Sequence, residues 1–224
     1  MTPVVLKLGG SLAETGRLRT MLAIVRRARR PVVIVPGGGP FADAVRDLQR
    51  ELGFSDEIAH DMALHAMHQM ADAMRAIEPR LVAAETLVGM ARAWRKRRVP
   101  VWLPARLCAG DRRIPRDWSI TSDGLAARLA ERLGNADLIV VKSCRIRRNA
   151  TAAALARRGI VDAVFPIIVE RAGLSWSVLG TGDAPALEQV LDAEPCPSKA
   201  SAAPGSRTRA FARGRGRAGV KWAE

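Results

Sequence analysis

Short apolar runs alternate with stretches of helical periodicity along most of the chain. Four runs rich in Val, Ile and Leu are typical of buried strands, and a fifth run is expected to be a strand in spite of an internal proline. These runs are Val4–Leu8, Val32–Val35, Val99–Leu103, Leu138–Val141 and Ala163–Val169. Because helical patterns separate the strands, the sequence predicts an α/β fold, a three-layer αβα sandwich around a mainly parallel central sheet.

Apolar residues recur at helical spacing between these strands. The helices expected from this spacing are Arg17–Arg29, Phe41–Leu52, Ser55–Ile77 and a segment that follows Thr121 and closes at Gly134. The apolar stripe of the third helix is Ile58, Met62, Ala66, Met70, Ala73 and Ile77. Leu64 and Met67 lie elsewhere on its circumference, so this helix is expected to be central or to form the interface of a homo-oligomer.

All three histidines of the chain, His60, His65 and His68, fall in the Ser55–Ile77 helix. Their spacings of five and three residues do not give the pair four residues apart that zinc enzymes carry on a helix. They are interpreted as polar positions of a buried or interface helix, and no metal site is expected.

Positive charge is in excess, and part of the excess lies at the C-terminal end. The 224 residues carry a formal net charge of +14. Residues 193–224 are dominated by Pro, Ser, Ala, Gly and Arg, which predicts a basic disordered tail after a folded domain over 1–192. The charge indicates either attraction to polyanions or solvated helix faces. Nucleic-acid binding is expected through the tail at most, since no aromatic RNA-binding motif is present.

Nothing in the sequence predicts a membrane or secreted location. No apolar run approaches the roughly 20 residues that a membrane span needs, and the first residues lack the basic start of a signal peptide. Three widely spaced cysteines suit a reducing compartment better than a disulfide framework. We therefore expect a cytoplasmic protein.

Two glycine loops follow the first two predicted strands. Lys7-Leu8-Gly9-Gly10-Ser11 is the first, and Gly37-Gly38-Gly39 is the second. Glycine lets the backbone approach a phosphate closely, and a helix that begins after each loop adds its positive end. Neither loop matches the Walker A or the dinucleotide-binding pattern. Lys7 interrupts a buried strand, so it is expected either to reach solvent from the strand end or to face the phosphate that is transferred.

A third polar block, Asp117–Gly124, precedes the helix that closes at Gly134. Thr121 or Ser122 is a suitable N-cap, and Asp123 falls in the first helical turn. A carboxylate there favours the helix dipole, so the local sequence leaves a capping role and a catalytic role for Asp123 both open.

In this order, the three blocks resemble the amino acid kinase superfamily, which includes kinases for acetylglutamate, aspartate and uridylate. The resemblance spans about residues 4–192. It implies that Gly9, Gly10 and Ser11 hold the phosphates of ATP, with Mg²⁺ bridging them, and that Lys7 stabilises the transferred phosphoryl group. It also implies that Gly37, Gly38 and Gly39 line the acceptor site and that Asp123 orients the catalytic lysine.

A finer resemblance is to the (aminomethyl)furan-methyl phosphate kinases of methanofuran biosynthesis. It rests on Gly39–Arg46, on Ala59–Ala63 with Ala66-Met67, and on Pro115–Asp123. It implies a small phosphorylated metabolite as acceptor. Arg46 is then a candidate for the acceptor phosphate and Asp43 for a substrate ammonium, although either residue could instead belong to an ordinary solvated face.

The sequence departs from the superfamily in its second half. The loop after the strand that ends near Lys142 is Ser143–Arg148, and the segment that usually carries a second catalytic lysine is missing. Lys142 or Arg145 is expected to substitute. The sequence therefore predicts an acceptor lobe over about 1–110 and a shortened nucleotide lobe over about 111–192. The alternative is a degenerate kinase fold that binds a nucleotide or anion without catalysis and acts as a partner or regulatory protein.

Overall fold

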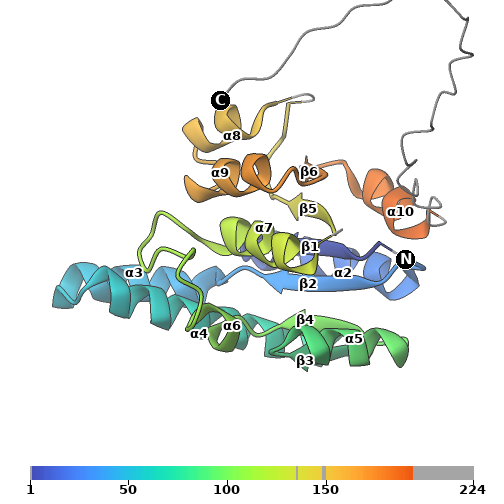
Figure 1. The fold of residues 1–224 in the computed structure, drawn as a ribbon, viewed down its shortest axis with the longest axis horizontal. Coiled ribbons are helices and arrows are strands. Elements are labelled where there is room, and N and C mark those ends of the chain that lie inside the picture. The colour runs from blue at the N-terminus through green and yellow to red at the C-terminus, as the bar shows by residue number, and fades with distance from the viewer. Residues whose placement is uncertain (1, 135, 148–149, 194–224) are drawn as a thin grey trace, which may run out of the picture.

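The computed structural model describes residues 2–134, 136–147 and 150–193. These residues form an α/β sandwich in which one sheet lies between two layers of helices (Figure 1). Residues 194–224, nearly all of the tail predicted at the C-terminal end, lie outside the described residues. None of the described helices is both long enough and apolar enough to cross a lipid bilayer.

All strands of the sheet run parallel, in the order β3-β4-β2-β1-β5-β6. They are β1 (Val4–Leu8), β2 (Val32–Pro36), β3 (Leu81–Ala84), β4 (Val99–Trp102), β5 (Asp137–Val141) and β6 (Trp176–Leu179). Val4 of the central strand β1 is in register with Val32 of β2 on one side and with Asp137 of β5 on the other. The predicted αβα sandwich around a mainly parallel sheet is confirmed.

Helices fill the connections between the strands. They are α1 (Ser11–Glu14), α2 (Arg17–Arg27), α3 (Gly39–Leu52), α4 (Asp56–Ile77), α5 (Leu87–Arg95), α6 (Ala105–Cys108), α7 (Ser122–Leu133), α8 (Ala152–Arg157), α9 (Val164–Arg171) and α10 (Ala184–Asp192). The predicted helices around 17–29, 41–52 and 55–77 are present with slightly different ends, and the Ser55 side chain caps α4 by accepting a hydrogen bond from the Ile58 N–H.

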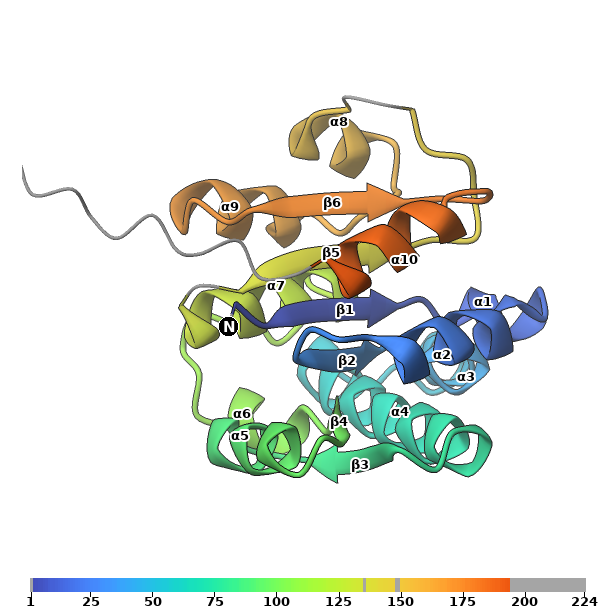
Figure 2. The same ribbon diagram turned by 90° about the vertical axis from the view of Figure 1, so that its right-hand side faces the viewer.

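Alternate residues of β1 face opposite helix layers. Val4, Leu6 and Leu8 share a core with α2, α10 and the C-terminal half of α4, whereas Val5 lies in the core formed with α5, α7 and α9. Figure 2 shows α2 and α10 in front of the sheet and α7 behind it. Lys7 follows Val5 by two residues and therefore points toward the α7 layer.

The connections after β1 and β5 leave the sheet on opposite faces. β1 leads into α2 in one layer, and β5 leads into α8 and α9 in the other. Neighbouring parallel strands that diverge in this way form a switch point, and ligands of open parallel sheets bind outside the carboxyl ends of the strands there. The ends of β1 and β5, at Lys7–Gly10 and Lys142, meet at this place.

The prediction of a strand over Ala163–Val169 is wrong, because these residues belong to helix α9. Pro166 lies in the first turn of the helix, where proline removes no intrahelical hydrogen bond. The side chain of Asp162 caps this turn, since its Oδ1 accepts a hydrogen bond from the Phe165 N–H at 2.9 Å. An apolar run of this length fits a helix as well as a strand, and the cap decides between them.

The apolar stripe predicted for α4 is only partly buried. Ile58 is 52% exposed and Ala73 is exposed, whereas Leu64 and Met67 belong to the core. The reason is that α4 packs against α3 and also against β2, β3 and β4, so its buried surface is wider than one stripe and is rotated from the predicted one.

Candidate active site

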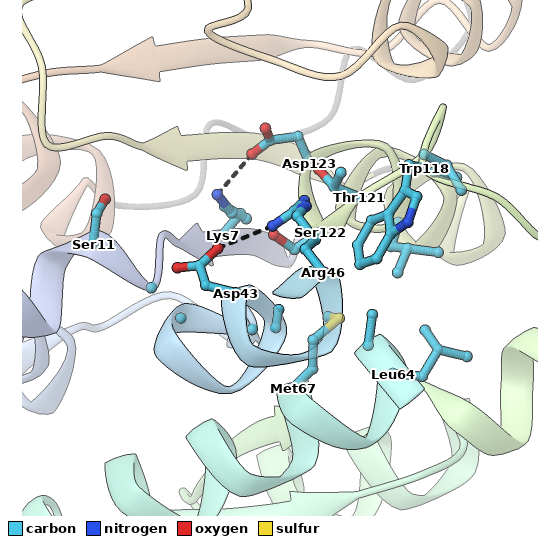
Figure 3. A pocket seen from close by; sticks show the side chains of 18 of the residues that line it. Lys7, Ser11, Asp43, Arg46, Leu64, Met67, Trp118, Thr121, Ser122 and Asp123 are labelled. Atoms are coloured by element: carbon cyan, nitrogen blue, oxygen red, sulfur yellow. Dashed lines mark hydrogen bonds and ion pairs between the residues drawn. The ribbon is translucent and has the colours of Figure 1, made fainter. Parts of the chain in front are cut away.

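One buried carboxylate lies between two lysine side chains at the carboxyl ends of β1 and β5. The Nζ atom of Lys7 is 2.8 Å from Oδ1 of Asp123, and the Nζ atom of Lys142 is 2.6 Å from Oδ2 (Figure 3 shows the first of these pairs). The side chains of Lys7 and Asp123 are only 5% and 4% exposed. The structure therefore brings together three residues that are far apart in the sequence and that were predicted to serve the site.

The electrostatics of this cluster favour the ionised form of Asp123. Burial alone raises the pKa of Asp123, but the charges of Lys7 and Lys142 and their hydrogen bonds outweigh it and hold the pKa below its ordinary value. Burial lowers the pKa of Lys7, and the attraction of Asp123 only partly opposes this effect. Asp123 is thus an ionised carboxylate with a lysine Nζ atom beside each of its oxygens.

The start of α7, which carries Asp123, is held by a residue that the sequence did not single out. Thr121 is the N-cap, but its side chain caps nothing. Instead Oδ2 of Asp162 accepts hydrogen bonds from the Thr121 N–H at 2.8 Å, the Thr121 hydroxyl at 2.9 Å and the Gly124 N–H at 2.7 Å. Burial and the nearby charge of Asp123 raise the pKa of Asp162. This carboxylate fixes α7 and α9 together, and no local pattern could have shown it.

The two glycine loops touch each other. A Cβ atom on Gly10 would lie 2.2 Å from the Gly39 Cα atom, and one on Gly37 would lie 2.5 Å from the Gly10 nitrogen. Gly39 also has a φ of +55°, in the left-handed region that favours glycine. The loops predicted for the ATP phosphates and for the acceptor therefore form one continuous backbone wall next to Lys7.

A cavity of about 260 Å³ opens beside this wall. Of the predicted site residues, its lining includes Lys7, Gly10, Ser11, Gly37, Gly38, Gly39, Asp43, Arg46, Asp123 and Lys142. Gly9 does not line the cavity, but a Cβ atom on it would lie 3.4 Å from the Lys7 Nζ atom. The cavity thus extends from the two lysines toward α3 and α4.

The far end of the cavity is formed by Arg46 and an aromatic residue that the sequence did not mark. The guanidinium carbon of Arg46 lies 4.2 Å from the centre of a Trp118 ring, in cation–π geometry. Arg46 also forms an ion pair of 3.1 Å with Asp43, and both side chains are largely exposed (Figure 3). The Trp118 indole N–H donates a hydrogen bond to Gln49 at 2.6 Å. The two candidates for substrate contacts are therefore partners of each other in the free protein.

The divergent loop after β5 also reaches the site. The hydroxyl of Ser143 lies 2.9 Å from that of Ser11 and joins the β5 loop to the first glycine loop. Of the two residues expected to substitute for the missing lysine, Lys142 lines the cavity, whereas Arg145 is exposed and does not line it. His60 is buried and lines the cavity wall, as expected for a polar position of a buried helix. Among the described residues, no group of three or more His, Cys, Asp or Glu side chains could hold a metal ion.

The model of the amino acid kinase family matches residues 2–144. The chain is also 27% identical over 138 residues to the [5-(aminomethyl)furan-3-yl]methyl phosphate kinase of Methanocaldococcus jannaschii. This match covers 61% of the chain and 63% of that relative, so it leaves more than a third of the relative's length unmatched.

Solved structures share the fold. The uridylate kinase of Archaeoglobus fulgidus superposes with a TM-score of 0.62 at 21% identity, over 85% of this chain and 95% of that one. The UMP kinase of Ureaplasma parvum gives 0.60 at 14% identity, over 85% and 94%. The carbamate kinase of Giardia lamblia, solved with AMP-PNP, gives 0.51 at 12% identity, over 83% and 94%. Because the family model matches more than half of the chain and the site lies at the loops described above, the chain belongs to the amino acid kinase family.

Proposed function

We propose that the chain is an ATP-dependent kinase that phosphorylates a small acceptor which already carries a phosphate group. The observation that carries this proposal is the buried cluster of Lys7, Lys142 and Asp123, in which two positive charges face one negative charge. Uncompensated buried charge is costly. An anion in the adjoining cavity would balance the cluster, and the glycine wall allows phosphate oxygens to come close.

In this proposal the protein acts mainly by position and charge. Lys7 and Lys142 lie on either side of Asp123, so both ammonium groups can neutralise the charge that spreads over the phosphoryl oxygens during transfer. Asp123 keeps the two lysines in place and does not remove a proton, since its pKa is held low and both its oxygens are occupied. A phosphate acceptor is already an anion and needs no general base.

ATP and Mg²⁺ are the proposed cofactors. The carboxylates that line the cavity are already paired, Asp123 with two lysines and Asp43 with Arg46. Mg²⁺ is therefore expected to arrive with the nucleotide phosphates, where it neutralises charge on the transferred group. Gly9, Gly10 and Ser11 are proposed to hold these phosphates on the β5 side of the sheet. In this proposal residues up to about 110 form the acceptor lobe, and residues from about 111 to 192 form the nucleotide lobe that holds the rest of ATP.

The acceptor is proposed to be an (aminomethyl)furan-methyl phosphate, as in the name of the Methanocaldococcus jannaschii relative. Such a molecule carries a phosphate and an ammonium group. Arg46 and Asp43 offer one charge of each sign at the mouth of the cavity, and their mutual ion pair is exposed and hence worth little. A ligand with both charges can replace this pair, with its phosphate near Arg46 and its ammonium near Asp43, and the flat ring can lie beside Trp118.

The test is a transfer assay with ATP and a panel of phosphomonoesters that includes the aminomethylfuran compound and UMP. Wild type is expected to phosphorylate at least one acceptor, and Lys7→Met and Lys142→Met are each expected to lower kcat by about 100-fold or more. Lys96→Met is the matched control, because Lys96 is exposed and lies outside the cavity.

The alternative of a non-catalytic binder gains no support from the comparisons, but the same assay decides it. Absence of transfer to every acceptor, together with nucleotide binding that survives in Lys7→Met, would overturn the proposed function. Transfer that depends on both lysines but not on Lys96 would exclude a protein that only binds its ligands.

A further inference from the structure

A second cavity lies at the opposite end of the sheet from Lys7, where the strands begin. Its volume is about 540 Å³. Three turns supply its positive charge: the turn between α2 and β2, the turn before β3, and the turn between α5 and β4. The arginines that line it are Arg29, Arg30, Arg80, Arg97 and Arg98. These turns lie near the N-terminus in Figure 1, on the side away from α3 and the glycine loops.

The charge of this cavity is poorly balanced by the residues around it. No carboxylate is among its lining residues. Within the described part of the chain, the one ion pair made by its arginines joins Arg30 to Asp137 at 2.5 Å. Glu78 is close, but one of its oxygens is occupied by the backbone N–H of Arg80 at 3.0 Å. Five arginines therefore line one cavity, and one of them has a carboxylate partner.

Two of the arginines are held in place by neutral groups alone. Arg80 donates to the carbonyls of Arg26 and Arg97, the latter at 3.1 Å. Arg98 donates to the carbonyls of Pro79 and Arg80, the latter at 3.0 Å. Carbonyl oxygens at the ends of helices and turns attract cations, which accounts for these two side chains. They fix the guanidinium groups without cancelling their charge, so less entropy is lost when an anion binds.

Arg30 is held in a similar way, since it donates to the carbonyls of Thr2 at 3.0 Å and Val190 at 3.5 Å and also pairs with Asp137. Arg29 and Arg97 are not explained by such contacts. Arg97 has a φ of +52°, and it is the sole residue other than glycine with a positive φ in the described backbone. It follows Lys96, the C-cap of α5, at a position where glycine is usual and where a side chain costs free energy. Arg29 is exposed and forms no ion pair with a described residue. Both side chains nevertheless line the cavity.

We propose that this cavity is a second ligand site, specific for a small molecule that carries several negative charges of the polyphosphate type. Phosphate oxygens match the forked donors of arginine. The volume lies in the range of small-molecule sites. Trp94 gives the cavity an aromatic wall, held in place by a hydrogen bond of 2.8 Å from its indole N–H to the Val32 carbonyl. The site does not depend on the kinase proposal, because it shares no residue with the cavity at Lys7.

The probe is inorganic tripolyphosphate, titrated into the full chain at about 0.15 M salt by calorimetry, with hydrogen exchange read by mass spectrometry to locate the bound anion. We expect slower exchange at residues 28–32 and 94–99. The test variant is Arg29→Gln with Arg97→Gly, which removes two charges and gives the left-handed position the residue it prefers, so the fold is retained. Its affinity at this site is expected to fall about tenfold or more.

The control variant is Arg19→Gln with Arg157→Gln, which removes the same charge from exposed positions outside the cavity. Its affinity is expected to remain within about twofold of wild type. Equal losses of tripolyphosphate affinity in the two variants would overturn the proposal. Protection from hydrogen exchange that is confined to residues 7–11 and 37–46 would also overturn it. A nucleoside triphosphate that binds here more tightly than tripolyphosphate identifies a nucleotide as the ligand, and equal affinities identify the phosphate chain alone. Tighter binding of single-stranded RNA with the same protection would reject a small ligand.

Discussion

Gly10 and Gly39 pack so closely that a Cβ atom on Gly10 would come within 2.2 Å of the Gly39 Cα atom and 2.3 Å of its nitrogen. The two glycines follow different strands, β1 and β2, and belong to the loops proposed for the nucleotide and for the acceptor. Backbone atoms on both sides leave no flexible group that could move aside. The contact therefore sets how near the two loops can come to each other.

Gly10→Ala is expected to push these loops apart. Because transfer requires the reacting atoms to be closely aligned, kcat/KM should fall by about 100-fold, and the free energy of unfolding should fall by about 1–3 kcal/mol. Steady-state kinetics and urea unfolding measure the two effects. Gly110→Ala is the control, since a Cβ atom there would meet no atom within 4 Å. Wild-type kinetics in Gly10→Ala would show that the loops do not share a fixed wall.

The pairing of Asp43 with Arg46 predicts how the acceptor is recognised. Asp43→Asn is expected to lower kcat/KM for an aminomethylfuran phosphate by about tenfold, a change of about 1.4 kcal/mol. For an analogue that lacks the amine, kcat/KM should stay within about twofold of the wild-type value, since only the ammonium is proposed to contact this carboxylate.

A matched control exists one turn further along α3. Asp47 pairs with Arg50 at the same spacing and with similar exposure, but it lies outside the cavity. Asp47→Asn is expected to change kcat/KM for neither substrate. If Asp43→Asn lowers kcat/KM equally for the aminated and the amine-free compounds, the proposed ammonium contact is wrong.

Exposed apolar side chains on α3 bear on the expected homo-oligomer. Phe41 is 41% exposed, Leu48 41% and Leu52 68%, and their spacing places them on one helix face. We expect this face to be covered by a second copy, so Leu48→Asp with Leu52→Asp should reduce the mass measured by light scattering to that of one chain. Val88→Asp, at a position 67% exposed on α5, is the control. A wild-type protein that is monomeric at micromolar concentration would contradict this expectation.

Much of the fold could be predicted because its central strands are mainly apolar runs that are followed by glycine or a charged residue. Such runs are typical of parallel strands buried on both faces, as β1, β2 and β5 are. The edge strands β3 and β6 are only partly buried, so neither stands out from its surroundings. The helix α9 was mistaken for a strand because its apolar run fits either element, although Asp162, three residues before Phe165, is a local cap that favours a helix.

The site residues also differ in whether they can be recognised from the sequence. Lys7 and Asp123 could be singled out because a charged residue in an apolar strand, or at a helix start after a polar block, is visible in the sequence itself. Trp118 and Ser143 could not, since each acquires its place through a partner far along the chain: Arg46 for the indole and Ser11 for the hydroxyl. A sequence pattern can identify a residue that is unusual for its local element. A residue whose role depends on a distant partner can be identified only from the folded structure.

A partly buried ionic network on α7 predicts how stability depends on pH. Arg128 donates to Asp111 at 2.7 Å and to Glu131 at 2.6 Å, and the three side chains are 12%, 6% and 15% exposed. Burial raises the pKa of Asp111, but the hydrogen bonds and charge of Arg128 prevail and hold it below its ordinary value. Burial likewise raises the pKa of Glu131, but its arginine partners on α7 and α9 outweigh this effect and hold the pKa below its ordinary value.

Carboxylates with lowered pKa values stabilise the fold while they are ionised. Their contribution is therefore complete above the ordinary values of about 3.9 and 4.3 and is lost as the pH falls below them, through the lowered values of the folded state. Arg128→Met is expected to lower the free energy of unfolding by about 2–4 kcal/mol at pH 7, because it leaves two partly buried carboxylates without their main partner. Urea unfolding from pH 7 to pH 3 should show this deficit shrinking toward the acid end.

The exposed pair Arg75–Asp72, at 2.7 Å and 41% and 67% exposure, has the same spacing of three residues along a helix as Arg128 and Glu131. Arg75→Met is therefore the control, and its effect should stay below about 0.5 kcal/mol at every pH, since solvent screens the pair. A deficit in Arg128→Met that is constant from pH 7 to pH 3 would mean that lost packing of the arginine stem, rather than its charge, accounts for the change.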